Sequence, residues 1–471
     1  MFLNIDKKKS DSLALVDNKG NRITYGTLAE LMEKVGGLVE PRTVIFNLCK
    51  NTAGSMIGYL GFIEHGAVPV TLNAKLDDGL LKDLLNIYTP AYIWVPVEEQ
   101  YRFDYEKIYE SYGYILLKTG NEPYPINEKL QLCMTTSGST GSPKLVRYKK
   151  GNLEANAKNV AIAFGWTEKE RAICDLGMQY TMGLNVINTH LYVGATVLLT
   201  THNLLSPEFW EYIKEERGTN FTGVPFSYDI FFRLHFERMY LPDLKTLSQG
   251  GGKLTEKRFT QLAEYAQKNG KRFIASFGTT ETSARMACLS SELAISKTGS
   301  IGRAIPEGEL FLVDENGKVV TAPVAEGEMC YKGPNVTMGY AVCREDLLKG
   351  DEFNGIYHTG DLARRDEDGC YYVTGRLSRF LKLLSYRVSL DQSERLIQQK
   401  FNIECACSGT DHRMNIYIVD GSKKAEVLEF ISEKTGLFKN LFKVFVVPEI
   451  LRNESGKIRY KKMDIQYAGE K

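Results

Sequence analysis

Hydrophobic and polar positions alternate with two different periods along the first two-thirds of the chain. Short runs rich in β-branched and aromatic residues have the spacing of buried strands, and the stretches between them have the spacing of amphipathic helices. The strand-like runs lie at residues 42–48, 67–72, 91–97, 195–200 and 272–278, and a helical stretch closed by glycine lies at residues 56–66. Strands that alternate with helices predict a layered α/β fold with largely parallel sheets.

The pattern changes near Gly299, where short strands separated by glycines predict a small β-rich subdomain. After Arg376 the chain resumes as an α+β stretch that is long enough for a separate compact domain. We therefore expect an α/β fold in two parts. Residues 1–376 would form a large N-terminal domain of layered α/β subdomains plus the β-rich subdomain, and residues 377–471 a small α+β C-terminal domain.

Composition and charge narrow the class of protein. The chain has 471 residues with 59 basic and 58 acidic side chains, a net charge of +1, so no basic surplus indicates a nucleic-acid partner. No apolar run reaches the roughly 20 residues that span a bilayer, and the first residues contain no apolar signal-peptide core. The nine cysteines include no CxxC pair, and the six histidines show no zinc-like spacing. We predict a cytoplasmic protein without a membrane span, in which Cys405 and Cys407 are packing residues of one strand.

A polar segment, TTSGSTGSPK at Thr135–Lys144, carries the first candidate chemistry. Its glycines let the backbone approach a ligand closely and its hydroxyls donate hydrogen bonds, which suits polyphosphate oxygens. It lacks the GxxxxGK[ST] spacing of the common nucleotide P-loop. The alternative is a flexible linker, because runs of Ser, Thr and Gly between periodic segments are usually loops.

A second segment, SFGTTE at Ser276–Glu281, follows an apolar strand directly. It is therefore expected at the carboxyl end of a sheet, where open α/β folds bind their ligands. A carboxylate beside hydroxyls can hold Mg²⁺ on a phosphate. The alternative is an ordinary strand-to-helix cap with an acidic first turn.

Two further segments are weaker when each is taken alone. In YHTGD, Asp361 follows a turn glycine and can accept both hydroxyls of a ribose, or it is a surface acid of a hairpin turn. In NESGKIR, Lys457 is one of many lysines in the chain.

Together and in this order, the four segments resemble motifs of the adenylate-forming superfamily. This superfamily contains acyl- and aryl-CoA synthetases, peptide-synthetase adenylation domains and firefly luciferase. The resemblance extends over essentially the whole chain, because other segments also match in order: ITYGTLAEL, GFIEHGAVPVTLN, GPNVTMGY and GRLSRFLKLLSYRV. Each of these matches is weak by itself, and their collinearity makes the resemblance specific.

The resemblance implies an enzyme that activates a carboxylic acid with ATP and Mg²⁺, giving an acyl-adenylate and pyrophosphate. The acyl group then passes to a thiol, either coenzyme A or the phosphopantetheine of a carrier protein. Because the carboxylate and the α-phosphate repel each other, the main tasks are charge neutralisation and in-line positioning.

By motif match, the catalytic residues would be Lys457, Thr280 and Glu281. Thr280 would contact the α-phosphate, Glu281 would hold Mg²⁺, and Lys457 would bridge carboxylate and α-phosphate oxygens from a mobile C-terminal domain. Asp361 would bind the ribose hydroxyls with Arg376 close by. The β- and γ-phosphates would lie in the loop formed by Thr135, Thr136, Ser137, Gly138, Ser139, Thr140, Gly141 and Lys144, and the remaining nucleotide contacts would be Ser276, Phe277, Gly278 and Thr279, with the Phe277 ring against adenine.

Two positions depart from the family pattern near the expected hinge between the domains. The residues after Gly-Arg are Leu377, Ser378 and Arg379, so Ser378 stands where an aspartate is common; a hinge requires a permissive backbone rather than one residue type. Ser385 replaces a glycine in a loop that lines the channel for the pantetheine arm. The added side chain predicts weaker or altered transfer to coenzyme A, unless the serine fits without strain.

The expected acid pocket maps to the stretch after Leu176. Gln179 and Tyr180 stand where amino-acid-activating members place a phenylalanine–aspartate pair, so a plain α-amino acid is disfavoured. Asp175 would serve in another alignment register. The expected pocket residues are Gln179, Tyr180, Gly183, Gln249, Gly250 and Gly251.

The sequence therefore predicts an ATP-dependent acid–thiol ligase that acts on a small carboxylic acid, with coenzyme A as the favoured acceptor. One alternative is an adenylation enzyme that loads an acyl or aminoacyl group onto a carrier protein, which would then be its partner. An alternative of another class is a nucleotide-binding regulator without catalysis. The presence of both Lys457 and Glu281 argues against the regulator, because binding alone does not require both.

Overall fold

The computed structural model describes residues 1–135, 144–384, 386–453 and 456–469. Contacts between Cα atoms divide the chain into two compact units. The first unit comprises Met1–Leu310 and Tyr331–Tyr357, and the second comprises Phe311–Cys330 and His358–Lys471. This division groups part of the β-rich segment with the C-terminal residues, and the expected hinge after residue 376 stays a prediction.

The first unit contains two large sheets. One is nine-stranded with the order β16-β15-β14-β13-β12-β10-β11-β1-β2, and the other is eight-stranded with the order β19-β9-β8-β4-β3-β5-β7-β6. The strands of the nine-stranded sheet are β1 (Leu13–Asp17), β2 (Arg22–Thr24), β10 (Arg171–Cys174), β11 (Thr196–Leu199), β12 (Asn220–Gly223), β13 (Thr246–Gln249), β14 (Arg272–Phe277), β15 (Ala287–Leu289) and β16 (Arg303–Ala304). Those of the eight-stranded sheet are β3 (Val44–Cys49), β4 (Val68–Asn73), β5 (Tyr92–Pro96), β6 (Glu106–Ser111), β7 (Tyr114–Lys118), β8 (Leu130–Thr135), β9 (Leu145–Lys149) and β19 (Tyr340–Ala341).

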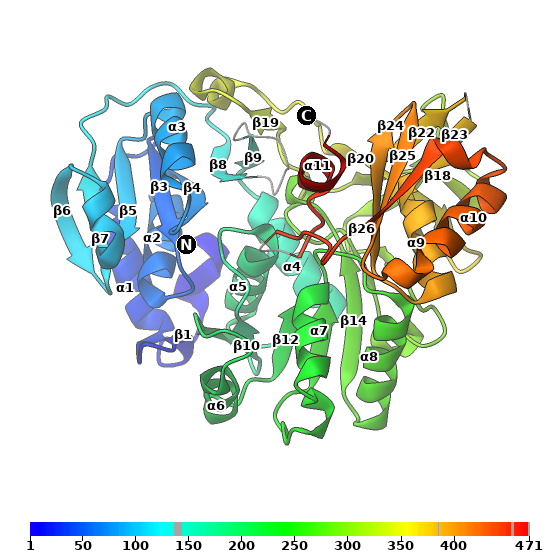
Figure 1. Ribbon diagram of the computed structural model, residues 1–471. Helices are drawn as coiled ribbons and strands as arrows, with labels where there is room; N and C mark the ends of the chain where they lie inside the picture. The colour runs from blue at the N-terminus through cyan, green and yellow to red at the C-terminus, as the bar shows by residue number, and fades with distance from the viewer. Residues whose placement is uncertain (136–143, 385, 454–455, 470–471) are drawn as a thin grey trace. The chain divides into compact units, whose positions relative to one another are not determined.

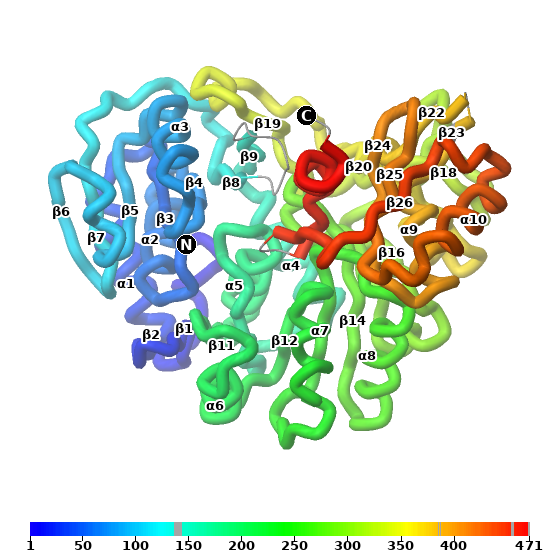
Figure 2. The backbone as a smooth tube through the Cα atoms, in the orientation of Figure 1, coloured from blue at the N-terminus to red at the C-terminus, as the bar shows by residue number. Residues whose placement is uncertain are grey.

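The central strands of both sheets are parallel. Strand β3 pairs in parallel with β4 and β5, and β13 pairs in parallel with β12 and β14. All six residues of β3 are buried, as expected for a parallel strand covered on both faces. Strand β1, from the start of the chain, lies beside β11 in a parallel pair (Figure 2). The expected layered α/β fold with largely parallel sheets is confirmed.

Helices cover both faces of the sheets in the first unit. One hydrophobic core joins residues of α1, α2, α4 and α5 to residues of β1, β3, β8, β9 and β11, so these helices pack between the two sheets. Helices α7 and α8 lie along strands β12 and β14 (Figure 1). The helices of this unit are α1 (Tyr25–Gly36), α2 (Ala53–Glu64), α3 (Asp78–Tyr88), α4 (Asn152–Phe164), α5 (Thr181–Val193), α6 (Pro207–Glu215), α7 (Pro225–Arg233) and α8 (Glu256–Lys268).

The second unit is built on smaller sheets. A four-stranded sheet has the order β17-β18-β20-β21, and further sheets join β22 to β23 and β24, β25 and β26 in that order. The elements are β17 (Glu309–Val313), β18 (Ala325–Lys332), β20 (Ile356–Arg365), β21 (Tyr371–Arg376), β22 (Phe380–Leu383), β23 (Tyr386–Ser389), α9 (Leu390–Phe401), β24 (Cys405–Thr410), β25 (Arg413–Ile418), α10 (Lys424–Thr435), β26 (Phe442–Val446) and α11 (Tyr460–Met463). Cys405 and Cys407 are buried in the core of this unit, as predicted.

None of the helices in the described part of the chain is long and apolar enough to cross a membrane. The predicted cytoplasmic location stays a prediction.

Candidate active site

The SFGTTE segment lies at the carboxyl end of β14, where the sequence placed it. The chain leaves the strand through Gly278 and enters a short 3₁₀ helix, η4 (Thr280–Thr282), for which Thr279 is the N-cap. A Cβ atom at Gly278 would overlap the carbonyl oxygen of Ala284, so only glycine fits this turn. The close backbone approach therefore fixes the direction in which Thr280 and Glu281 leave the strand.

Glu281 is held from two sides. The Tyr340 hydroxyl donates a 2.7 Å hydrogen bond to Glu281 Oε1, and the Thr337 backbone N–H donates to the Glu281 carbonyl at 2.9 Å. Lys144 Nζ lies 3.1 Å from the centroid of the Tyr340 ring. Burial, together with the charge of Glu281, raises the pKa of Tyr340, so its hydroxyl stays a neutral donor. One tyrosine thus contacts both the expected Mg²⁺ ligand and the lysine that ends the expected phosphate loop.

A second tyrosine, Tyr148, connects Thr280 to the two strands that flank the expected phosphate loop. Tyr148, on β9, is fully buried, and its hydroxyl donates a 2.7 Å hydrogen bond to the Thr280 carbonyl. Strands β8 and β9 are antiparallel, with Thr135 opposite Leu145. The loop residues Thr136, Ser137, Gly138, Ser139, Thr140 and Gly141 lie outside the described residues.

Asp361 and Arg376, in the second unit, form a pair. They face each other across the antiparallel strands β20 and β21, and Arg376 Nε lies 2.7 Å from Asp361 Oδ1. The Asp361 side chain is 2% exposed, whereas that of Arg376 is 60% exposed. The backbone N–H of Asp361 donates to Thr359 Oγ1 at 3.0 Å, and this hydrogen bond stabilises the backbone of the YHTGD segment next to the aspartate.

Lys457 is joined to Asn453 by two hydrogen bonds. The Asn453 side chain accepts a 2.9 Å hydrogen bond from the Lys457 backbone N–H, and the Asn453 N–H donates to the Lys457 carbonyl at 2.9 Å. An isolated antiparallel bridge pairs Arg452 with Ile458. Lys457 itself is exposed.

Arg379, at the expected hinge, is fastened to the C-terminal part of the second unit. Arg379 Nε lies 2.6 Å from Asp391 Oδ1, and Nη2 lies 2.7 Å from Glu394 Oε1. Its guanidinium also stacks on the Tyr460 ring at 3.7 Å. Ser385, the position at which we expected an effect on the pantetheine arm, lies outside the described residues.

The expected acid-pocket residues lie on three neighbouring elements of the first unit. Tyr180 caps the start of α5, Gly183 lies in that helix, and buried Gln179 precedes it. Gln249 ends β13, and its carbonyl accepts a 2.7 Å hydrogen bond from Ser276 Oγ on β14. A Cβ atom at Gly250, which is followed by Gly251, would overlap Met182 Cε, so the end of β13 packs closely against the start of α5. The structure thus brings α5, β13 and β14 together beside the SFGTTE segment.

Asp175, the alternative pocket acid, follows β10 directly. Its Oδ1 atom is buried and has no hydrogen-bond partner among the described residues. Burial raises the pKa of its carboxyl to about 7. A carboxyl held in this way is poorly suited to be a permanent anion for an ammonium group.

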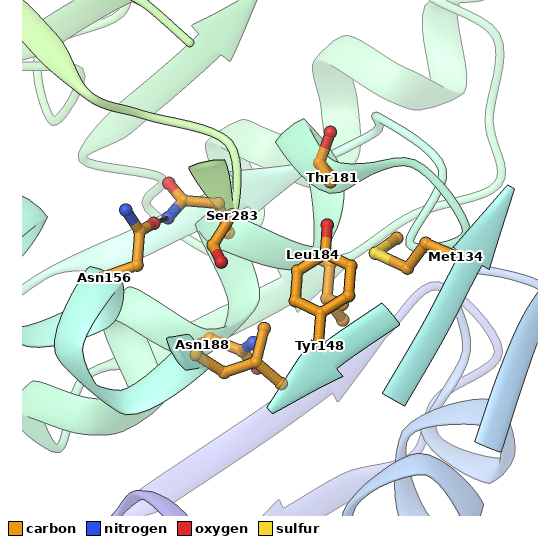
Figure 3. Close-up of a pocket in the computed structure, with 9 residues that line it drawn as sticks. Met134, Tyr148, Asn156, Thr181, Leu184, Asn188 and Ser283 are labelled. Atoms are coloured by element: carbon orange, nitrogen blue, oxygen red, sulfur yellow. Dashed lines mark hydrogen bonds between the residues drawn. The ribbon is translucent and has the colours of Figure 1, made fainter. Parts of the chain in front are cut away.

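A small cavity of about 10 Å³, close to the space of one water molecule, lies between β8, β9, α4 and α5 (Figure 3). Tyr148, whose hydroxyl bonds to the Thr280 carbonyl, forms part of its wall. The lining residues are Met134, Tyr148, Leu153, Asn156, Thr181, Leu184, Asn185, Asn188 and Ser283.

Comparison with known proteins decides the family. A family model described as AMP-binding enzyme matches residues 3–341. The chain belongs to the AMP-binding enzyme family. It is similar to the 2-succinylbenzoate--CoA ligase of Bacillus cereus (strain ZK / E33L), with 30% identity over 410 residues that cover 83% of this chain and 82% of that protein. A second ligase of the same name, from Bacillus cereus (strain ATCC 14579), is 29% identical over 457 residues, or 92% of each chain.

Solved structures of AMP-forming ligases share the fold of this AMP-binding enzyme. The o-succinylbenzoate CoA synthetase of Bacillus subtilis in complex with the acyl-adenylate intermediate OSB-AMP has a TM-score of 0.79 and 21% identity, with 98% of this chain and 97% of that chain covered. An anthranilate CoA ligase in complex with anthranoyl-AMP also has a TM-score of 0.79, with 20% identity and coverage of 98% and 96%. The predicted family and the predicted fold are both confirmed.

The residues of this AMP-binding enzyme fit a magnesium-bound nucleotide at Glu281. Among the described residues, Tyr340 is the one hydrogen-bond donor to the Glu281 carboxylate, so Oε2 accepts no hydrogen bond from them. A carboxylate oxygen beside threonine hydroxyls is a suitable ligand set for Mg²⁺. The individual roles given to the site residues stay predictions.

Sequence reasoning did not assign a role to Tyr340, although it ends the GPNVTMGY segment. Its contacts with Glu281 and Lys144 depend on the pairing of β19 with β9. The position of the tyrosine at the end of a family segment was the signal that could have found it.

Proposed function

We propose that this protein activates a carboxylic acid with ATP and then transfers the acyl group to coenzyme A. Membership of the AMP-binding family and the CoA ligase activity in the names of its relatives support this proposal. The observation that carries it is the arrangement of Lys144, Tyr340 and Glu281 at the carboxyl end of β14. A positive charge close to a metal-binding carboxylate is what the binding of a triphosphate requires, which supports the proposal.

In the first half-reaction, a carboxylate oxygen of the acid attacks the α-phosphorus of ATP. The bond from this phosphorus to the bridging oxygen breaks, and pyrophosphate leaves with the electron pair. Thr280 would orient the α-phosphate, and Lys457 would offset the negative charge that develops on its oxygens. Glu281 would hold Mg²⁺, which neutralises phosphate charge when bound, and Asp361 would hold the ribose hydroxyls.

In the second half-reaction, the thiol sulfur attacks the carbonyl carbon of the acyl-adenylate. The bond between the acyl carbon and the phosphate oxygen breaks, AMP leaves, and the thiol proton passes to solvent. The products are an acyl thioester and AMP.

We propose 2-succinylbenzoate and related aryl keto acids as the first acids to test. The support is the name shared by the two curated relatives, which align with most of this chain. ATP with Mg²⁺ is supported by a neighbour in the same fold, the Bacillus subtilis synthetase in complex with ATP and magnesium ion, at a TM-score of 0.75 and 20% identity. A cytoplasmic location fits these soluble small-molecule substrates.

The experiment that tests the proposal is mass spectrometry of reactions that contain the protein, ATP, Mg²⁺ and a pooled acid library, with and without coenzyme A. We expect an acyl-CoA product whose mass identifies the acid. An acyl-AMP that persists in the presence of coenzyme A would replace coenzyme A by a carrier protein as acceptor. ATP binding without any adenylate would overturn the proposal in favour of a nucleotide-binding regulator.

A further inference from the structure

Three side chains of metal-binding types converge in the second unit, and none of them has a role in the proposed reaction. Glu328 and Cys330 lie two positions apart on β18, so they point to the same face of the sheet, and His358 lies on the neighbouring strand β20. A carboxylate oxygen, a sulfur and a ring nitrogen of these residues all lie within 4.8 Å of one another. Within the described ranges of the chain, no other group of three His, Cys, Asp or Glu side chains converges this closely.

The distances between the ligand atoms fit one small cation. Cys330 Sγ lies 3.3 Å from His358 Nδ1, which lies 3.5 Å from Glu328 Oε2. A tetrahedral Zn²⁺, with bonds of about 2.3 Å to sulfur and about 2.0 Å to nitrogen and oxygen, separates its ligand atoms by about 3.3–3.5 Å. Hydrogen bonding alone does not satisfy both contacts, because one ring nitrogen either donates one proton or accepts one. A shared cation satisfies all three atoms.

The Glu328 carboxylate is oriented by a hydrogen bond from the backbone. Its Oε1 accepts a 3.1 Å hydrogen bond from the Gly360 N–H, which leaves Oε2 for the contact with His358. Carboxylates that bind metals are commonly held by a second hydrogen bond of this kind. Cys330 is buried, whereas the side chains of Glu328 and His358 are 18% and 58% exposed, so a cation can enter from the side of the imidazole.

The types of ligand select for zinc rather than for magnesium. A thiolate, an imidazole and a carboxylate are the ligands that Zn²⁺ takes in proteins, whereas Mg²⁺ prefers six oxygen atoms. Burial, together with the charge of Glu328, raises the pKa of the Cys330 thiol to about 12, so a cation that binds the sulfur must displace the thiol proton to solvent. A soft or borderline metal ion forms a thiolate bond strong enough to do so.

We propose that Glu328, Cys330 and His358 form a binding site for one Zn²⁺ ion, with a water molecule in the fourth position. The bound ion would connect β18 to β20 and hold the YHTGD segment, because His358 and the Gly360 N–H that orients Glu328 both belong to that segment. The spacing of histidines and cysteines along the sequence did not indicate this site, because its ligands come from two strands that are separated by more than 20 residues.

The experiment measures metal binding by the full-length protein, without nucleotide, after removal of metal ions by a chelator. Competition between the protein and a chromophoric zinc indicator gives the affinity and the stoichiometry for Zn²⁺. Co²⁺ serves as a spectroscopic substitute, because a thiolate bound to Co²⁺ gives a charge-transfer absorption in the near ultraviolet. Each measurement is repeated in excess Mg²⁺.

We expect one Zn²⁺ per chain, the thiolate absorption with Co²⁺, and no competition by Mg²⁺. Cys330→Ser, His358→Gln and Glu328→Gln should each weaken Zn²⁺ binding about tenfold or more, since loss of a partner outside the ligand set already costs that much in metal sites. Cys330→Ser should also abolish the thiolate absorption.

Two variants outside the cluster are matched controls. His235 Nδ1 lies 3.2 Å from Glu237 Oε1, so His235→Gln changes a histidine–carboxylate pair of similar geometry. Cys343→Ser removes another thiol, one that is partly exposed. Both variants should bind Zn²⁺ like the wild-type protein.

Several outcomes would overturn the inference and leave the proposed function untouched, because none of the measurements depends on catalysis. These are the absence of Zn²⁺ binding, binding of Co²⁺ without the thiolate absorption, and an unchanged Zn²⁺ affinity in any one of the three ligand variants. Equal loss of affinity in the control variants would also overturn it. Circular dichroism checks that each variant folds, and His358→Gln decides the result if Cys330→Ser does not fold, because its side chain is exposed.

Discussion

At the scale of single residues, Tyr340 is the contact shared by two oppositely charged groups. Its hydroxyl donates to Glu281 Oε1 at 2.7 Å, and its ring lies 3.1 Å from Lys144 Nζ. A phenylalanine would keep the ring for the lysine and lose the donor to the carboxylate. The two interactions can therefore be separated by substitution.

Tyr340→Phe should reduce adenylate formation by raising the requirement for magnesium–ATP. A hydrogen bond to a charged group contributes about 1.5–3 kcal/mol, so we expect a loss of about ten- to hundredfold in kcat/KM for ATP. The measurement is pyrophosphate release as a function of Mg²⁺ concentration. Tyr25→Phe, which removes another buried hydroxyl that donates 2.7 Å to the Ala195 carbonyl, is the matched control and should not change the Mg²⁺ dependence. An unchanged Mg²⁺ dependence in Tyr340→Phe would contradict the role of the tyrosine.

The buried carboxyl of Asp175 should make the free energy of unfolding depend on pH. Burial raises the pKa of its carboxyl from 3.8 to about 7, so between these values the folded protein keeps a proton that the unfolded chain has lost. The contribution of Asp175 to the free energy of unfolding therefore falls as pH rises from about 4 to 7 and is constant above that range.

Asp175→Asn removes this ionisation and should stabilise the protein at pH 8 by roughly 2 kcal/mol, after allowance for partial exposure. The gain should vanish below pH 4. Thermal unfolding midpoints measured from pH 4 to 8 check the prediction, with Asp104→Asn at an exposed site as the control. A gain that is the same at every pH would show that the ionisation of Asp175 is not its cause.

Among the secondary-structure elements, β22, which follows the expected hinge, is connected to helices α9 and α11 by one residue, Arg379. Arg379 precedes β22 directly, and it contacts Asp391 and Glu394 on α9 and the Tyr460 ring at the start of α11. The Glu394 carboxyl is buried, and burial raises its pKa to about 7 although Arg379 lowers it. Since Tyr460 follows the segment that carries Lys457, Arg379 also supports that segment.

Arg379→Ala should destabilise the second unit by roughly 3 kcal/mol, because it leaves Glu394 buried without its cation. Differential scanning calorimetry of the full chain should show an earlier unfolding transition. Lys423→Ala breaks an exposed pair with Glu426 on the same unit and should have little effect. If both variants unfold like the wild-type protein, the buried cluster does not hold the unit together.

At the scale of the whole molecule, the residues expected to adenylate the acid are divided between the two units. Thr280 and Glu281 belong to the first unit, whereas Asp361 and Lys457 belong to the second. The family resemblance implies that the C-terminal part takes one pose for adenylation and another for thiol transfer. Lys457 should then matter for the first half-reaction alone.

Lys457→Ala should lower the rate of adenylate formation by about 10²–10³-fold, the loss typical of a donor to developing charge. Capture of a chemically supplied acyl-adenylate by coenzyme A should stay close to the wild-type rate. Rapid-quench assays of the two half-reactions measure both rates, and Lys461→Ala, at an exposed neighbouring lysine, is the control. Equal loss in both half-reactions would remove Lys457 from its assigned role.

The local pattern of hydrophobic and polar residues predicted much of the fold and part of the candidate site. The strands near residues 42–48 and 272–278 follow from apolar β-branched runs, because burial between layers requires such runs in parallel strands. The direction of the SFGTTE segment follows from Gly278, because a side chain there would overlap Ala284. Asp361 and Arg376 were expected to lie close, and antiparallel pairing of β20 and β21 places them opposite each other.

The alternation of strands and helices, the family to which the motifs belong and the order of the motifs could therefore be predicted from the chain, because they depend on local periodicity and residue type. Strand order and side-chain packing, in contrast, establish that Tyr340 joins Lys144 to Glu281 and that Arg379 closes a buried ionic cluster. These contacts join residues far apart in the sequence. They depend on strand order and side-chain packing, which no local pattern contains.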